Sequence, residues 1–100
     1  MDVHITTRHT TLSEEEHQAA VSAAEHLEKF HSHLIRLDIT VSEESGYKEA
    51  EFAARVQGHT VVAKERASEH SKAIHDARDK IERQLIKLND RQHDVRATLI

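Results

Sequence analysis

The sequence predicts an α+β domain, a two-layer β-α-β-β-β-α sandwich in which two helices cover one face of a four-stranded sheet. Two long segments place apolar residues three and four positions apart, which is the spacing of an amphipathic helix. Shorter segments alternate apolar and polar residues, so each strand should have one buried and one solvated face. Both helices must then cover the same face of the sheet. The 100 residues fit one domain of this kind.

The first strand and the first helix are predicted at the start of the chain. Val3, Ile5 and Thr7 alternate with polar neighbours, which favours a short strand. Ser13 and Glu16 have the spacing of a capping box, so a helix should begin there and end near residue 31. The apolar stripe of this helix consists of Ala20, Ala24, Leu27 and Phe30.

Three further strands are predicted in the middle of the chain, at residues 36–42, 50–56 and 60–64. Residues 43–46 and 57–59 contain the two glycines and read as turns. Because the first helix separates the first two strands, these strands can be parallel neighbours joined by a right-handed crossover. The sheet face away from the helices should display polar residues such as Arg36, Asp38, Thr40, Glu49, Glu51 and Arg55.

The closing helix is predicted over residues 67–91, with Ser68 as its N-cap and no Gly or Pro inside it. Its apolar stripe consists of Ile74, Ala77, Ile81, Leu85 and Leu88. Residues 1–91 form the predicted domain, and residues 92–100 are a tail that can be a helix end, an added strand or disordered. The predicted core of the domain contains Leu27, Phe30, Ile39, Phe52, Ile74, Ile81 and Leu85.

The composition argues against catalysis. The chain has no cysteine, no glycine-rich phosphate loop and no serine elbow. Its runs of glutamate lie at a predicted helix start and a predicted turn, where they do not converge on a site. We therefore expect no catalytic residue, no cofactor and no small-molecule substrate.

The ten histidines raise the question of a metal site. His26, His31 and His33, or His70 and His75, are the closest groups, but their spacings of five and two do not place ligands on one helix face. We expect no metal ligands here, and we expect these histidines to be solvated on helix surfaces.

No targeting or membrane segment is visible, because the chain lacks an apolar run of signal-peptide or membrane-span length. We expect a soluble cytoplasmic protein without membrane contact. The net charge of −4 is unevenly divided. Residues 1–50 carry four Lys/Arg against ten Asp/Glu, whereas residues 51–100 carry ten against eight. A polyanionic partner should therefore meet the C-terminal half.

A basic ridge is predicted on the closing helix. Arg83 lies roughly opposite the apolar stripe, with Lys80, Lys87 and Arg91 within about 80° of it around the helix axis. Such a ridge can bind the phosphates of RNA. The helix pattern alone also allows a purely structural interpretation, in which the pairs Asp76–Lys80 and Asp79–Arg83 simply support an exposed helix.

Several motifs resemble those of the ribosome hibernation-promoting factors, also called ribosome-associated inhibitors or sigma-54 modulation proteins. That family typically has a strand, a tight glycine turn, a strand ending in Ala-acidic, and a helix with Ala-Ile-Asp and Asp-Lys-Leu-Glu-Arg-Gln-Leu. Here these motifs correspond to Gly58, Ala63, residues 73–74 and the block DKIERQL at residues 79–85. The segment ITTRHTTLSEEE is similar to the family's first strand, turn and helix start, with Arg8 at the arginine position. Thr7 replaces the family's glycine, and residues 69–72 replace its Asp-Met-Tyr.

The resemblance implies the same fold and a short form without the C-terminal dimerising domain of longer members. It also implies binding to rRNA of the small ribosomal subunit, in the channel used by messenger and transfer RNA, so that translation stops and idle bacterial ribosomes are preserved under stress. The predicted RNA-binding residues are Arg8, Arg66, Lys72, Arg78, Lys80, Arg83, Lys87 and Arg91.

Three aromatic residues are too few for a multi-ring stacking platform, so we expect recognition of backbone shape and charge. A second hypothesis is that the fold serves as a protein-interaction module. It would use its acidic first helix or its exposed sheet face without binding ribosomes.

Overall fold

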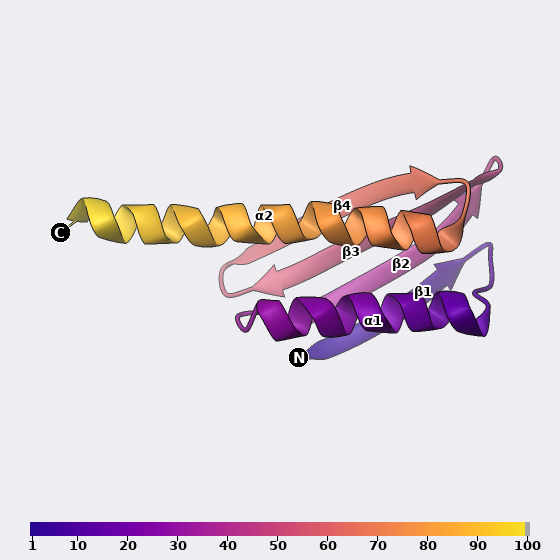
Figure 1. Ribbon diagram of the computed structural model, residues 1–100, viewed down its shortest axis with the longest axis horizontal. Coiled ribbons are helices and arrows are strands. Elements are labelled where there is room, and N and C mark those ends of the chain that lie inside the picture. The colour runs from indigo at the N-terminus through magenta and orange to yellow at the C-terminus, as the bar shows by residue number, and fades with distance from the viewer. Residues whose placement is uncertain (100) are drawn as a thin grey trace.

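The computed structural model describes the backbone of residues 1–99 and the side chains of residues 1–89. Its elements follow the predicted order: β1 (Asp2–Arg8), α1 (Glu14–Phe30), β2 (Arg36–Glu44), β3 (Tyr47–Val56), β4 (His59–Ala67) and α2 (His70–Leu99). Both helices lie on the same side of the sheet, and α2 runs past the end of the strands toward the C-terminus (Figure 1). The predicted α+β sandwich is confirmed.

The sheet has the strand order β1-β2-β3-β4. As predicted, β1 and β2 are parallel, whereas the β2–β3 and β3–β4 pairs are antiparallel. A buried row crosses the sheet from Ile5 through Ile39 and Phe52 to Ala63. Because side chains alternate along each strand, the neighbouring rows face away from the helices.

The core lies between this sheet face and the two helices. Leu27, Ile39, Phe52 and Ile81 are fully buried, and the predicted Ile74 and Leu85 are buried with them. The prediction of Phe30 as a core residue was wrong, because its side chain is 60% exposed. Phe30 is the last residue of α1, and its ring lies 4.8 Å from the ring of His26. The chain then turns back, and Leu34 enters the core instead.

The two helices begin differently. The predicted capping box of α1 is confirmed: the Ser13 hydroxyl accepts from the Glu16 amide at 3.1 Å, and the Ser13 amide donates to Oε1 of Glu16 at 2.8 Å. The prediction for α2 was wrong at its start, because β4 continues to Ala67 and the helix begins at His70. Pairing of Ala67 with Lys48 keeps this segment in the sheet, so Ser68 does not act as the cap.

The strands are longer than predicted because the turns are tighter. The β2–β3 turn is a two-residue loop, Ser45 and Gly46, and both residues have positive φ, as a hairpin of the type I′ class requires. The backbone of residues 92–99 continues α2, which was one of the alternatives for the tail. The domain boundary at residue 91 stays a prediction, and side chains from residue 90 onward lie outside the described part.

Candidate nucleic-acid interface

The structure divides the predicted RNA-binding residues between two faces of the molecule. Lys72, Arg83 and Lys87 are exposed on α2, on the helix side of the sandwich. Arg8 and Arg66 lie on the open face of the sheet, in one cross-strand row that runs Arg8, Ser42, Glu49, Arg66. Three strand spacings separate the two arginines, which is about 14 Å. The side chain of Arg91 lies outside the described residues.

The ion pairs on α2 differ from those expected. Lys80 extends to the edge strand, where its Nζ lies 3.4 Å from Oε1 of Glu65 and 3.4 Å from the carbonyl oxygen of Lys64. Asp76 therefore pairs with Lys72 at 2.9 Å, and this hydrogen bond raises the pKa of Lys72. Asp79 is engaged by Arg78 at 2.8 Å, and its pKa is lowered by that guanidinium. The two predicted i,i+4 pairs are thus replaced.

The charges of Arg83 and Lys87 are available for binding an external anion. Both side chains are exposed, and neither makes an ion pair within residues 1–89. They are one turn apart on a helix that the core holds through Ile81 and Leu85. A hollow of about 300 Å³ lies beside Arg83, lined by Glu65, Asp76, Asp79, Lys80 and Arg83. Three carboxylates line this hollow, so an anion would meet Arg83 and Lys87 from their solvent-exposed side and not through the hollow.

Arg78 lies on the flank of α2 that faces α1. Its side chain is 24% exposed, and its Nε is buried without a hydrogen-bond partner in the protein. Its guanidinium reaches Asp79 through another nitrogen. Its predicted contact with RNA stays a prediction, and only 24% of its side chain is exposed to a partner.

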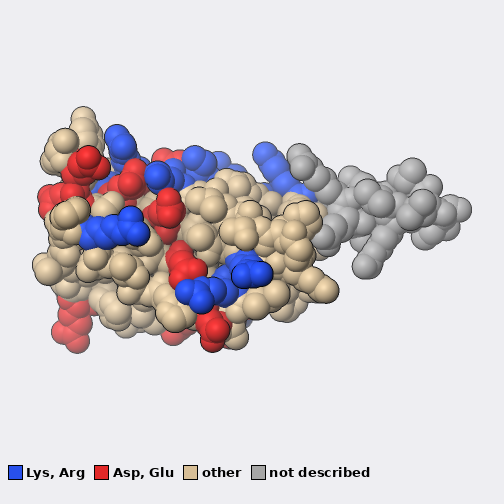
Figure 2. All heavy atoms as spheres, turned by 180° about the vertical axis from the view of Figure 1, so that it is seen from behind, with Lys and Arg blue, Asp and Glu red and all other residues tan. Residues whose placement is uncertain are grey.

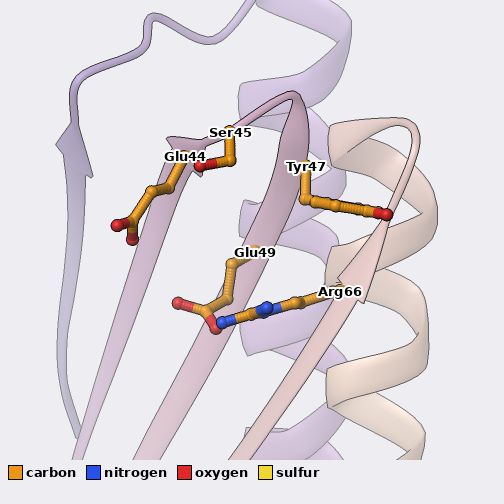
Figure 3. Close-up of a pocket in the computed structure, with 5 residues that line it drawn as sticks. All are labelled: Glu44, Ser45, Tyr47, Glu49 and Arg66. Atoms are coloured by element: carbon orange, nitrogen blue, oxygen red, sulfur yellow. The ribbon is translucent and has the colours of Figure 1, made fainter.

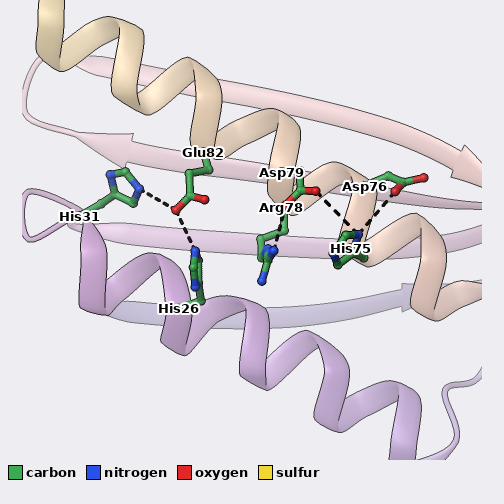
Figure 4. A network of polar contacts seen from close by, with 7 residues as sticks. All are labelled: His26, His31, His75, Asp76, Arg78, Asp79 and Glu82. Carbon is green, nitrogen blue, oxygen red and sulfur yellow. Dashed lines mark hydrogen bonds and ion pairs between the residues drawn. The ribbon is translucent and has the colours of Figure 1, made fainter.

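Two histidines meet one carboxylate in the seam between the helices. Nε2 of His26 and Nε2 of His31 lie 2.8 and 3.1 Å from Oε2 of Glu82 (Figure 4). Burial acts to raise the pKa of Glu82, but the hydrogen bonds from both imidazoles hold it below the ordinary value. The expectation that these histidines are solvated on helix surfaces was therefore wrong.

A third histidine, His70, makes contacts at the other end of the same seam between the helices. His70 is only 7% exposed; its Nδ1 lies 2.9 Å from Oε2 of Glu16, and its Nε2 lies 3.0 Å from the hydroxyl of Thr10. The pKa of Glu16 is lowered by the backbone hydrogen bond from Ser13 and by the bond from His70. Sequence analysis missed these contacts, because their partners are more than fifty residues apart and follow no helical or strand period.

The open face of the sheet carries mixed charge, with Lys/Arg and Asp/Glu side chains interspersed across it (Figure 2). Arg66 is tied to Glu49, with Nε 3.2 Å from Oε1. Close to this pair is a hollow of about 190 Å³, lined by Glu44, Ser45, Tyr47, Glu49 and Arg66 (Figure 3). Tyr47 is 58% exposed there, a feature that the sequence analysis did not single out.

Two findings concern other classes of site. Within residues 1–89, no three His, Asp or Glu side chains are arranged to hold a metal ion. In the part of the chain that the structure describes, no helix combines the length and the apolarity needed to cross a membrane.

Comparison with known proteins places this geometry in context. The family model described as "Sigma 54 modulation protein / S30EA ribosomal protein" matches residues 3–93. Comparison with curated protein sequences gives no significant match.

Two solved structures have the same fold. A ribosomal subunit interface protein from Coxiella burnetii superposes with a TM-score of 0.83 at 16% identity, over 90% of this chain and 99% of that chain. The N-terminal domain of Thermus thermophilus Protein Y gives a TM-score of 0.76 at 17% identity, over 88% of this chain and 99% of that domain. At these identities the likeness concerns the fold.

Proposed function

The chain belongs to the sigma 54 modulation protein / S30EA ribosomal protein family, and we propose that it binds the small ribosomal subunit in the cytoplasm as a hibernation factor. In this proposal the protein occupies the rRNA channel used by messenger and transfer RNA and inhibits translation without chemistry of its own. The observation that carries the proposal is the exposed pair Arg83 and Lys87 on a helix anchored in the core.

The physical basis is the release of counterions from RNA. Each phosphate that a lysine or arginine neutralises frees condensed cations, and this gain in entropy drives association. Arg83 and Lys87 need not leave an ion pair with another side chain of residues 1–89 in order to bind. The predicted Arg91 follows one turn later on the same helix.

The acidic groups that give the net charge of −4 are partly placed away from the exposed pair on α2. The acidic half of the chain includes three glutamates in the first turn of α1, where they stabilise the helix dipole. Other carboxylates pair with cations at the sheet or the helix seam, as Asp38 does with Arg36 at 2.9 Å. A polyanion can therefore approach the outer face of α2 while many of the acidic groups are neutralised locally.

Ribosome co-sedimentation of a charge-reversed variant tests the proposal. Replacing Arg83, Lys87 and Arg91 with Glu should abolish co-sedimentation, because at least two of these side chains are exposed cations. The slope of log affinity against log salt should fall by about 0.7–0.9 for each lost phosphate contact.

A matched control reverses three exposed cations elsewhere: Lys29 on α1, and Arg36 and Arg55 on the open sheet face. Both variants carry the same net charge, so only the position of the reversal differs. The control should still co-sediment. Unimpaired co-sedimentation of the folded α2 variant would contradict the ribosomal proposal. It would favour the protein-interaction module, for which the mixed charge of the open sheet face is the supporting observation.

A further inference from the structure

One histidine of the helix seam joins a hydroxyl to a carboxylate. Nε2 of His70 lies 3.0 Å from Oγ1 of Thr10, and Nδ1 of the same ring lies 2.9 Å from Oε2 of Glu16. These side chains come from the β1–α1 loop, the first turn of α1 and the first residue of α2. A hydroxyl, an imidazole and a carboxylate in this order form the kind of triad that activates a nucleophile.

The carboxylate determines which ring nitrogen of His70 carries the proton. Hydrogen bonds from the backbone of Ser13 and from His70 lower the pKa of Glu16, so its carboxylate is ionised at neutral pH. An ionised carboxylate only accepts hydrogen bonds, so Nδ1 of His70 must donate. In the neutral imidazole Nε2 is then an acceptor, and the hydroxyl of Thr10 donates to it. The ring is therefore placed to remove the hydroxyl proton of Thr10.

The triad is held in place by the surrounding structure. His70 is only 7% exposed. Oε1 of Glu16 accepts from the amide of Ser13 at 2.8 Å, so both oxygens of this carboxylate are engaged. Groups that are oriented in advance need little reorganisation when a reaction begins.

Thr10 belongs to the loop between β1 and α1, and the residue before it has an unusual backbone. His9 has a φ of 56°, in the left-handed region that residues other than glycine rarely adopt. Residues with such strained backbones cluster at functional sites. Thr10 is partly exposed, whereas His70 is buried. A small reagent can therefore reach Thr10 from solvent while the base is shielded.

Two further charged groups lie near the ring of His70. The ring faces Glu43 as well as Glu16, and Glu43 is bonded to Lys48. The two carboxylates favour the positive charge that the imidazole gains when Nε2 takes a proton. The surroundings of His70 therefore stabilise the charge that proton removal from Thr10 creates.

From this geometry we propose that Thr10 is an acyl acceptor, with His70 as its general base and Glu16 as the residue that orients the ring. The substrate is a small activated acyl compound, such as an acyl phosphate or an aryl ester. Oγ1 of Thr10 forms a bond to the carbonyl carbon, and the bond from that carbon to the leaving group breaks. The proton of Thr10 passes through Nε2 of His70 to the leaving group, and the product is an ester on Thr10.

This inference goes beyond the proposed function, because ribosome binding does not require the reaction. It also revises the sequence-based expectation of no catalytic residue. Thr10 and His70 are sixty positions apart, so no sequence motif joins them.

Labelling of the wild-type chain with p-nitrophenyl acetate tests the proposal. The chain should release p-nitrophenolate and gain an acetyl ester at Thr10, which mass spectrometry of the digested protein locates. Thr11 is the adjacent, exposed hydroxyl and serves as the internal reference. Thr10 should be labelled about 10²-fold faster than Thr11 or more, which is the usual contribution of a positioned general base.

Four variants separate the roles of the three side chains. Thr10→Val should abolish the label. His70→Gln should lower the rate of labelling about 10²-fold. Glu16→Gln should lower it as well, because an amide no longer fixes the proton on Nδ1. Ser13→Ala is the matched control, since it weakens the capping box that Glu16 also serves but leaves the triad intact, so the label should remain.

Equal labelling of Thr10 and Thr11 in the wild type would overturn the proposal, and this outcome needs no variant. Labelling of Thr10 at the wild-type rate in a folded His70→Gln chain would overturn it too. Loss of the label in Ser13→Ala, to the same extent as in Glu16→Gln, would show that helix capping and not the triad governs the reactivity. Thermal melting of each variant shows that it is folded.

Discussion

The two flanks of α2 contact the rest of the domain through different basic side chains. Toward β4, Lys80 reaches Glu65 and the backbone of the edge strand. Toward α1, the contacts pair His26 and His31 with Glu82, and His70 with Glu16. Within residues 1–89, every ion pair between the α1 region and α2 uses a histidine as its basic partner.

The basic partner is therefore a lysine on one flank of α2 and a set of histidines on the other. Lysine stays charged throughout the physiological range, whereas histidine is the side chain that changes charge between pH 5 and 8. The carboxylates of the seam remain ionised, because the pKa values of Glu16 and Glu82 are held below the ordinary value. The electrostatic strength of the seam therefore depends on its imidazoles.

Other charged groups also lie at the seam. Between its two ends is Arg78, which bonds to Asp79 of its own helix at 2.8 Å (Figure 4). At one end Glu82 faces the two imidazoles, and at the other end His70 faces both Glu16 and Glu43. Glu43 is itself bonded to Lys48 on β3, and this hydrogen bond lowers the pKa of Glu43.

The largest expected effect on stability comes from the apolar stripe by which α2 packs against the core. Leu85→Ala should lower the free energy of unfolding by roughly 2–5 kcal/mol, because the buried side chain leaves a cavity. Urea unfolding measures this change. Ile86→Ala, at a neighbouring side chain that is 47% exposed, is the control and should cost far less. Equal losses would mean that the stripe of α2 does not face the core as described.

A smaller effect should distinguish the two flanks at pH 6. Glu82→Gln removes the negative charge that the two imidazoles share and puts an amide in its place, and it should cost about 1–3 kcal/mol of unfolding free energy, since Glu82 is only 24% exposed. Glu65→Gln breaks a more exposed pair and should cost under about 1 kcal/mol. Urea denaturation of both variants makes the comparison. A larger loss at Glu65 would show that the lysine contact, and not the histidine seam, stabilises α2.

The smallest effect concerns pH and sharpens the same comparison. The pKa of Glu82 is lowered in the folded state, so its contribution exists above its ordinary value of 4.5 and disappears as the pH falls through the folded value. The stability difference between wild type and Glu82→Gln should therefore shrink below about pH 4.5.

Urea titrations at several pH values measure this difference. The corresponding difference for Glu65→Gln, which breaks a more exposed pair, should stay under about 1 kcal/mol at each pH. A difference for Glu82→Gln that does not shrink below about pH 4.5 would show that the charge of Glu82 does not stabilise the seam.

Local patterns in the sequence were enough to predict much of the fold. The alternation through Ala50, Phe52 and Ala54 predicted which face of β3 is buried, because side chains in a strand alternate strictly. The capping box at Ser13 and Glu16 predicted the start of α1, because its bonds join residues three apart. The prediction that Phe30 is buried was wrong, because at the end of the helix, next to a turn, the apolar stripe no longer faces the sheet.

The candidate site could be predicted from local patterns only in part. The exposure of Arg83 and Lys87 follows from helical periodicity, so it could be predicted. The position of Arg66 beside Tyr47 could not, because it depends on the register of β4 against β3. A shift of one residue would have placed Arg66 on the buried face.

The sequence by itself determined the order of the elements, the buried face of most of them and the exposure of Arg83 and Lys87 on α2. These properties depend on residues within one or two turns or strand repeats of each other. Only the tertiary structure decided that Lys80 binds the edge strand, that His26 and His31 share Glu82, and that Tyr47 and Arg66 frame one hollow. Those contacts join residues that are distant along the chain, and no local periodicity encodes which of them will meet.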